Sequence, residues 1–366
     1  MLAIKHLTLS HFRSHRVTRL DVDARPLAFF GPNGAGKTNV LEAVSLLSPG
    51  RGLRRATVDE FARQPEGLGW KIKAEVQAGG FHEVETWADP GSARAVRVDS
   101  KAASQVDLGR MVRVLWLIPA MDRLWIEGAE GRRRFLDRMT LSFEPGHAEQ
   151  ALSYEKAMRD RNRLLKDQVG DPSWYRALEV QMARAGVEMI RARAATLEAL
   201  SEAQAGAETA FPTADLAITH PDGPLPDSEE GLLRAWEDTR RRDIAAGRTL
   251  IGPHRVDMEA VYAAKGVPAR AASTGEQKAL LVSLILANGR ALAARVGAPP
   301  LLLLDEVAAH LDAGRQAALY DEICALGAQA WMTGTGPELF TALGDRAQRY
   351  EVTEDTGTSV VTECAP

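Results

Sequence analysis

The chain has 366 residues, of which 45% are hydrophobic and 26% charged, and its net charge is −4. This composition is typical of a globular protein with room for two domains, and two cysteines exclude a disulfide framework. No run approaches the ~20 apolar residues of a membrane span, and the N-terminus lacks the layout of a secretory signal. We therefore expect a cytoplasmic protein without membrane contact, in which any nucleic-acid contact depends on a local patch.

The first third of the chain alternates apolar and polar residues as strands do. The candidate strands are "LAIKHLTL", "RLDVDA", "LAFFG", "WKIKAEVQ", "HEVETW" and "ARAVRVDS". From 131 to 242 helical periodicity takes over, and a stripe from Leu178 to Leu200 predicts a helix of about thirty residues. After Gly252 strands and helices alternate again, with the buried strand "LLLLD" between two helices.

This order of elements predicts an α/β fold with one mixed sheet made from both ends of the chain. We place its two parts at 1–125 and 246–366, and a helical insertion at 126–245.

The segment "GPNGAGKTN" follows the strand "LAFF" and has the spacing G-x-x-x-x-G-K-[ST] of a phosphate-binding P-loop. Glycines let backbone N–H groups curl around a phosphate, and the helix that follows adds the positive end of its dipole. Lys37 is expected to reach the β- and γ-phosphates, and Thr38 to ligate Mg²⁺. The predicted ATP-binding residues are Gly31, Pro32, Asn33, Gly34, Ala35, Gly36, Lys37, Thr38 and Asn39.

A second element of a nucleotide site lies in "PPLLLLDEVAAHLD". Four leucines predict a buried strand, and Asp305 at its carboxyl end is the expected second Mg²⁺ ligand, opposite Thr38. Glu306 is the candidate catalytic residue, because a carboxylate there could orient or deprotonate the attacking water. The alternative is a buried strand capped by acidic residues.

The segment "STGEQ" allows two interpretations. Ser273 and Glu276 form the pattern of a capping box at the start of a helix. Gly275 in the first turn would also let an anion approach the helix start. The five residues Ser273, Thr274, Gly275, Glu276 and Gln277 resemble the signature motif of ABC-type ATPases, which lies about thirty residues before the acidic strand, as it does here. That resemblance implies a homodimer in which each signature caps the ATP of the other subunit.

Three further segments make the resemblance specific to one family among the ABC-type ATPases. "LSHFRSH" is similar to the segment that opens SMC-like and RecF heads, while "GRRRFLDRM" and "IGPHRVDM" resemble RecF segments on either side of the helical lobe. Together with the motifs above they extend from Leu9 to Asp312. The sequence thus resembles the RecF family of DNA replication and repair proteins. One segment departs from the family pattern: in "WLIPAMDRLW" only Pro119 is clear, so the Q-loop ligand is unassigned.

The resemblance implies an ABC-type ATPase head with an inserted α-helical arm, ATP and Mg²⁺ as cofactors, and a weak, DNA-stimulated ATPase used as a switch. It also implies sequence-independent binding of duplex or gapped DNA and cooperation with RecO and RecR in loading RecA, with a link to the SOS response. Arg13 would lie beside the nucleotide, although "FRSH" is equally well a turn between strands. Thr333 stands where many ABC ATPases carry a switch histidine.

A local basic patch is the candidate DNA contact. Between Arg110 and Lys166 there are 12 Lys and Arg against 8 Asp and Glu. The residues proposed to contact DNA phosphates are Arg132, Arg133 and Arg134. Basic residues at such spacing are equally often a solvated helix face.

Two other functions are considered. An ABC-headed nuclease of the overcoming-lysogenization type would need an acidic metal-binding domain, for which little chain remains after Thr335. A short SMC-like DNA tether would need a long coiled coil, and the insertion offers at most a short arm.

Overall fold

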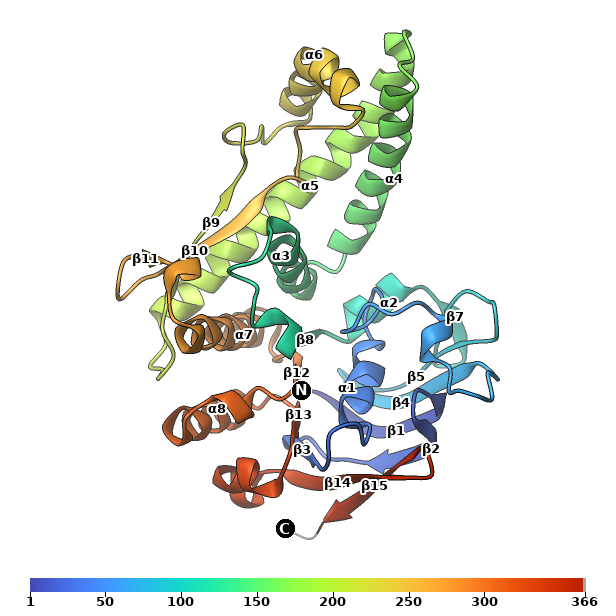
Figure 1. Ribbon diagram of the computed structural model, residues 1–366, viewed down its shortest axis with the longest axis vertical. Helices are drawn as coiled ribbons and strands as arrows, with labels where there is room; N and C mark the ends of the chain where they lie inside the picture. The colour runs from blue at the N-terminus through green and yellow to red at the C-terminus, as the bar shows by residue number, and fades with distance from the viewer. Residues whose placement is uncertain (365–366) are drawn as a thin grey trace. The chain divides into compact units, whose positions relative to one another are not determined.

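The computed structural model describes residues 1–364, apart from the side chain of His310. The chain forms two compact units (Figure 1). The first comprises Met1–Asp122, Ala203–Thr213 and Ser273–Pro366, and the second comprises Arg123–Glu202 and Ala214–Ala272. The second unit continues beyond 245 because the strand at 257–262 pairs with the strand at 214–219. The domain limits expected from sequence remain a prediction.

The first unit contains a six-stranded sheet in the order β15-β14-β3-β13-β12-β8. Its strands are β3 (Leu27–Phe30), β8 (Val114–Leu117), β12 (Leu301–Leu304), β13 (Ala330–Gly334), β14 (Gln348–Asp355) and β15 (Thr358–Cys364). All neighbours pair in parallel except β14 and β15. The carboxyl ends of β3, β13 and β12 therefore lie at one edge, which is where open α/β sheets bind ligands.

A second sheet of this unit is antiparallel, in the order β2-β1-β4-β5-β6-β7. Its strands are β1 (Leu2–Phe12), β2 (His15–Asp21), β4 (Trp70–Ala78), β5 (Phe81–Ala88), β6 (Ala95–Val98) and β7 (Lys101–Ala103). Strand β1 shows the alternating burial expected of a half-buried strand. Each of the six segments predicted as strands in the first third of the chain overlaps an observed strand, but "RLDVDA" shares only Arg19–Asp21 with β2. The expectation of one mixed sheet is corrected, because β1, β2, β4, β5 and β6 form this separate antiparallel sheet and, of the six, only β3 joins the mixed one.

The helices of the first unit are α1 (Lys37–Ser45), α2 (Gln105–Met111), α7 (Thr274–Val296) and α8 (Ala313–Leu326). Among the described residues there are five 3₁₀ segments: η1 (Asp59–Phe61), η2 (Pro119–Met121), η3 (Ala269–Ala271), η4 (Ala308–His310) and η5 (Pro337–Arg346). The segment η5 follows β13 and is interrupted at Gly344 by a non-helical backbone.

Helix α7 is long and apolar enough to cross a membrane by length and composition alone. However, 67% of its most apolar window is buried inside the structure. Leu280, Leu284 and Ala287 are fully buried, so α7 has the burial of a core helix.

The second unit combines helices α3 (Ala129–Phe143), α4 (His147–Lys166), α5 (Pro172–Ala205) and α6 (Glu229–Ala246) with a small antiparallel sheet. That sheet has the order β11-β10-β9, from β9 (Ala214–Thr219), β10 (Asp257–Tyr262) and β11 (Val267–Pro268). The long helix predicted from Leu178 to Leu200 is confirmed as part of α5. Strand β9 was not predicted, because "ADLAIT" is short and its partner lies about forty residues further along the chain.

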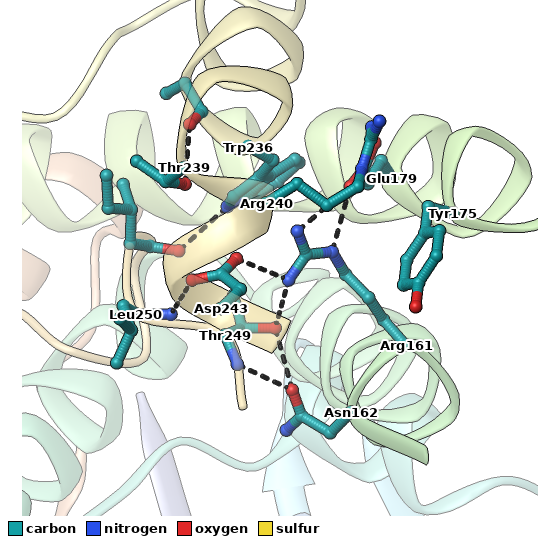
Figure 2. Close-up of polar contacts among 12 residues, drawn as sticks. Arg161, Asn162, Tyr175, Glu179, Trp236, Thr239, Arg240, Asp243, Thr249 and Leu250 are labelled. Atoms are coloured by element: carbon teal, nitrogen blue, oxygen red, sulfur yellow. Dashed lines mark hydrogen bonds and ion pairs between the residues drawn. The ribbon is translucent and has the colours of Figure 1, made fainter. Parts of the chain in front are cut away.

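Helices α4, α5 and α6 pack around one apolar cluster that includes Tyr154, Met182 and Trp236. A buried polar network lies among the same helices (Figure 2). The Arg161 guanidinium pairs with Glu179 at 3.0 Å and with Asp243 at 2.7 Å, and all three side chains are completely buried. Such a network is stable only when its charges balance and its donors find acceptors.

Candidate nucleotide-binding site

The P-loop joins β3 to α1 and depends on glycine at three positions. Gly31, Gly34 and Gly36 have φ values of 146°, 85° and 104°, which L side chains rarely adopt. A Cβ at Gly31 would overlap the Val352 carbonyl of β14, whereas nothing lies within 4 Å of the corresponding position at Gly34. The loop is therefore packed against the sheet at its start and open at its tip.

Helix α1 begins directly after Gly36, which has a left-handed conformation and provides no side-chain cap. The first N–H groups of this helix are thus available to an anion, as expected for a phosphate site. The start of a helix at this point, predicted from the sequence, is confirmed.

The Lys37 side chain folds over the loop. Its ammonium group donates hydrogen bonds to the Gly31 carbonyl at 2.7 Å and the Pro32 carbonyl at 2.8 Å. Burial lowers the pKa of Lys37, while the nearby carboxylates of Glu306 and Asp305 act in the opposite direction. A partly desolvated cation at the mouth of the loop is well suited to attract phosphate oxygens.

Thr38 and Asp305, predicted as a pair of Mg²⁺ ligands, are in direct contact. The Thr38 hydroxyl donates to the Asp305 carboxylate at 2.8 Å. Strand β13 lies between β3 and β12, and its Thr333 hydroxyl donates to the same carboxylate oxygen at 2.7 Å. Oxygen ligands of this kind suit Mg²⁺, so the residues fit the ion that the family implies.

Glu306 follows Asp305 with a φ of 54°, which is unusual for a residue other than glycine. Its backbone N–H donates to the Thr333 hydroxyl at 2.9 Å. Thr333 thus fixes both acidic residues at the end of β12, by accepting from one and donating to the other. The position of Thr333 between the ends of β3 and β12 was not predicted, because the sequence does not reveal the strand order.

Behind the P-loop, the β1–β2 turn and the C-terminal hairpin meet. The Ser359 hydroxyl lies 2.6 Å from both the Ala35 carbonyl and the Ser14 hydroxyl. Asn39, one of the predicted ATP-binding residues, donates from its side-chain amide to Ser14 at 2.7 Å. A Cβ at Gly36 would overlap the Ser359 hydroxyl. Residues from both ends of the chain therefore support the loop, and no sequence motif marks Ser359.

Arg13, expected beside the nucleotide, has a φ of 54° at the end of β1. Its guanidinium makes a two-bond pair with the carboxylate of Glu42, at 2.9 Å for each bond, and donates to the Glu60 carbonyl at 2.7 Å. Glu42 is fully buried in α1 and also pairs with Arg54. Arg13 thus anchors α1 to β1, and its contact with ATP remains a prediction.

The signature turn begins α7. Ser273 and Glu276 form the capping box expected from the sequence, with the Ser273 backbone N–H donating to Glu276 at 2.9 Å. Ser273, Thr274 and Gly275 are exposed, and nothing lies within 4 Å of a Cβ added at Gly275. Gln277 is buried. The turn is open to a partner, and its contact with a second nucleotide remains a prediction.

In "WLIPAMDRLW", where the sequence assigns no Q-loop ligand, Asp122 follows directly after η2. Its carboxylate accepts from the ammonium group of Lys278 in α7 at 3.3 Å. Burial lowers the pKa of Lys278, and the charge of Asp122 opposes this shift. An ion pair between η2 and the signature helix was not predicted, because the two segments are far apart in the sequence.

The three arginines proposed to contact DNA lie on α3 in the second unit, and they have different surroundings. Arg132 makes a two-bond pair with Asp257 of β10, at 2.7 Å for each bond. Arg133 donates to the Val256 carbonyl at 2.7 Å. Arg134 pairs with Glu130 one turn earlier on an exposed face. Arg132 and Arg133 therefore hold α3 against β10, and a DNA contact by these arginines remains a prediction.

A P-loop after β3, an acidic residue after β12 and a helix start at α7 that resembles a signature are together typical of ABC-type ATPase heads, here of the SMC-like kind. A family model described as the RecF/RecN/SMC N-terminal domain matches residues 3–356. The chain belongs to the RecF family. The DNA replication and repair protein RecF of Rhizobium rhizogenes is 47% identical over 364 residues, covering 95% of this chain and 96% of the relative. The protein of the same name from Agrobacterium fabrum is 46% identical over 365 residues, covering 96% and 97%.

Solved structures agree in fold. A structure of the recombination mediator protein RecF with ATP, described as part of the RecFOR pathway, has a TM-score of 0.85 at 22% identity and covers 100% of this chain and 98% of its own. The Smc head domain of Pyrococcus furiosus, bound to a domain of ScpA, has a TM-score of 0.58 at 17% identity, with coverages of 100% and 97%. At these identities the likeness concerns the fold.

Proposed function

We propose that this protein is an ATP-dependent DNA-binding protein of recombinational repair and replication-gap processing. ATP would bring two chains together on duplex or gapped DNA, and slow hydrolysis would separate them. Family membership further suggests that it cooperates with RecO and RecR in loading RecA. Hydrolysis would then serve as a switch for DNA binding.

The hydrogen bond between Thr38 and Asp305 carries this proposal, because it joins the P-loop to the acidic strand end. These two residues would hold Mg²⁺, which neutralises phosphate charge when bound. Lys37, now hydrogen-bonded to loop carbonyls, would turn to the β- and γ-phosphates. Glu306 would orient or deprotonate the attacking water.

The second part of the proposal concerns the partner subunit. In ABC-type heads the signature of one subunit caps the ATP held by another, and the exposed turn at Ser273–Gly275 supports this arrangement. Because the capping box already occupies part of the helix start, the nucleotide would approach through the open space at Gly275.

Retention of the protein on gapped duplex DNA tests the proposal. We expect the wild-type chain to remain bound with ATP and Mg²⁺ and to leave the DNA intact, while Lys37→Met loses the ATP-dependent part of the binding. Equal retention with and without ATP would contradict an ATP-dependent DNA-binding function. Cleavage of the DNA would instead favour a nuclease.

A further inference from the structure

Helix α4 carries four exposed basic residues, Lys156, Arg159, Arg163 and Lys166. At 3.6 residues per turn, these positions fall within an arc of about 80° on one face of the helix. We call these four residues the α4 stripe. With a rise of 1.5 Å per residue, the stripe is about 15 Å long.

The opposite face of α4 is fixed inside the second unit. Tyr154, Ala157 and Leu165 are buried, and Arg161 is held by Glu179 and Asp243 (Figure 2). Asn162 adds a further anchor by accepting from the Thr249 backbone N–H at 2.8 Å. The inner face is thus tied to α5, α6 and the segment after α6, so the α4 stripe is carried on a helix that cannot rotate freely.

The basic residues of α4 therefore divide into two kinds. Arg161 has both of its acidic partners inside the fold and cannot contribute charge to the surface. Arg163 makes one long contact of 3.6 Å with Asp160, and its side chain is 74% exposed. Lys156, Arg159 and Lys166 have no partner among the ion pairs and hydrogen bonds of the described residues.

A face that only confers solubility would alternate the signs of its charges. Exposed helix faces elsewhere in the unit do so: Glu230 pairs with Arg234 on α6 at 2.5 Å. In the stripe, by contrast, each basic residue from Lys156 to Arg163 is followed three or four positions later by another basic residue, an arrangement that destabilises an isolated helix. Glu155 and Asp160 lie beside the stripe, and among the described residues Asp160 makes only the 3.6 Å contact with Arg163. Arg163 and Lys166 also complement the negative end of the helix dipole. Lys156 and Arg159 lie near the middle of α4, where the helix dipole does not favour a basic residue.

We propose that the α4 stripe binds the phosphate backbone of duplex DNA without regard to base sequence. Both strands together present a phosphate about every 1.7 Å of duplex axis, so each of the four side chains would meet a phosphate whatever the sequence. The inference rests on the proposed DNA-binding function and assigns the contact to α4 instead of Arg132 and Arg133, which are engaged with β10.

The salt dependence of duplex binding tests the stripe. In one variant Lys156, Arg159, Arg163 and Lys166 are all replaced by Gln, which keeps the helix but removes four charges. In a matched control Arg176, Arg184, Arg234 and Arg241, which are exposed in the same unit, are also replaced by Gln. Both variants are first compared with the wild type in thermal unfolding, and binding to two unrelated duplexes is then measured with ATP over a range of salt concentrations.

The slope of log affinity against log salt is negative, and we expect it to become shallower by up to about 3.6 in the stripe variant, since each duplex phosphate contact contributes about 0.9. The loss should be the same for both duplexes, and the control should keep the wild-type slope. A folded stripe variant with the wild-type slope, or an equal loss in the control, would overturn the α4 contact and leave the proposed function standing. A wild-type chain that binds neither duplex would overturn both proposals.

Discussion

The hydroxyl of Thr38 donates a hydrogen bond of 2.8 Å to the carboxylate of Asp305. The two residues are far apart in the sequence, yet parallel pairing brings the ends of β3 and β12 to one sheet edge with β13 between them. Thr333 on β13 completes the contact by donating to the same carboxylate. The arrangement provides oxygen ligands beside a lysine and a helix start, which is what a nucleotide with its metal requires.

Replacement of Lys37 by Met should abolish tight ATP binding. The change removes the cation that folds over the loop, but it leaves the glycines and the burial of the aliphatic chain. Equilibrium binding of a fluorescent ATP analogue measures the loss, and circular dichroism checks that the fold is kept. Wild-type affinity in a folded variant would remove the P-loop assignment.

Two glycine substitutions should distinguish the role of the P-loop in ATP binding from the proposed role of the signature turn in dimerisation. Gly36→Ala places a Cβ against Ser359 at a φ of 104°, so ATP binding should fail. Gly275→Ala meets open space, and Ala favours a helix by up to about 1 kcal/mol over Gly. This second variant should be as stable as the wild type and bind ATP, but dimerise poorly. Thermal unfolding, ATP titration and light scattering measure the three properties, and unimpaired dimerisation of Gly275→Ala would argue against a signature role for the turn.

His15 should make the first unit sensitive to acid. It is fully buried between Thr18 and the Gly36 carbonyl, and burial lowers its pKa from 6.5 to about 4, against the raising effect of the carbonyl. Between these pH values the unfolded chain binds a proton that the folded chain does not, so the free energy of unfolding falls as the pH drops from 6.5 towards 4. The loss from this group is ~3 kcal/mol.

Urea unfolding at pH 7 and pH 5 measures this effect, with His15→Gln as the comparison. The variant should lose part of the pH dependence, because His254 in the second unit also has a pKa of about 4, lowered first by burial. An unchanged pH dependence in His15→Gln would mean that His15 is not the group responsible.

Arg132 and Arg134 offer a test of the roles of neighbouring arginines on α3. Arg132→Ala leaves Asp257 without its two-bond partner, which should cost about 1–3 kcal/mol of unfolding free energy. Arg134→Ala removes only an exposed pair and should change stability by less than about 0.5 kcal/mol. Urea unfolding compares them. Equal effects on the free energy of unfolding would show that burial of the Arg132–Asp257 pair does not contribute to the stability of the second unit.

The sequence was informative where chemistry depends on local spacing. The P-loop turn, the capping box of Ser273 and the buried strand before Asp305 are contiguous motifs, so composition and periodicity were enough to predict their local structure. Contacts that depend on strand order could not be predicted in this way. Thr333 lies between β3 and β12 only because β13 does, and Ser359 reaches Ala35 only because the last strand pair packs behind the loop.

The basic residues illustrate the same limit. Charge counting treats Arg132, Arg161 and Arg163 alike, but their surroundings differ completely. Arg132 is held by Asp257, Arg161 is buried between two carboxylates, and Arg163 is exposed. Which arginine is available to a ligand is decided by tertiary packing, which a one-dimensional count of charges does not contain.

ATP-dependent dimerisation is the central claim, and light scattering of Glu306→Gln with and without ATP and Mg²⁺ tests it most directly. The substitution keeps the shape of the side chain and removes the carboxylate that would handle the water, so hydrolysis should stop and the dimer should accumulate. Ser273→Arg, with a bulky side chain on the exposed turn, is the matched variant that should bind ATP and stay monomeric. We predict a doubling of mass for Glu306→Gln with ATP. A Glu306→Gln chain that binds ATP yet remains a monomer, with or without DNA, would contradict the claim.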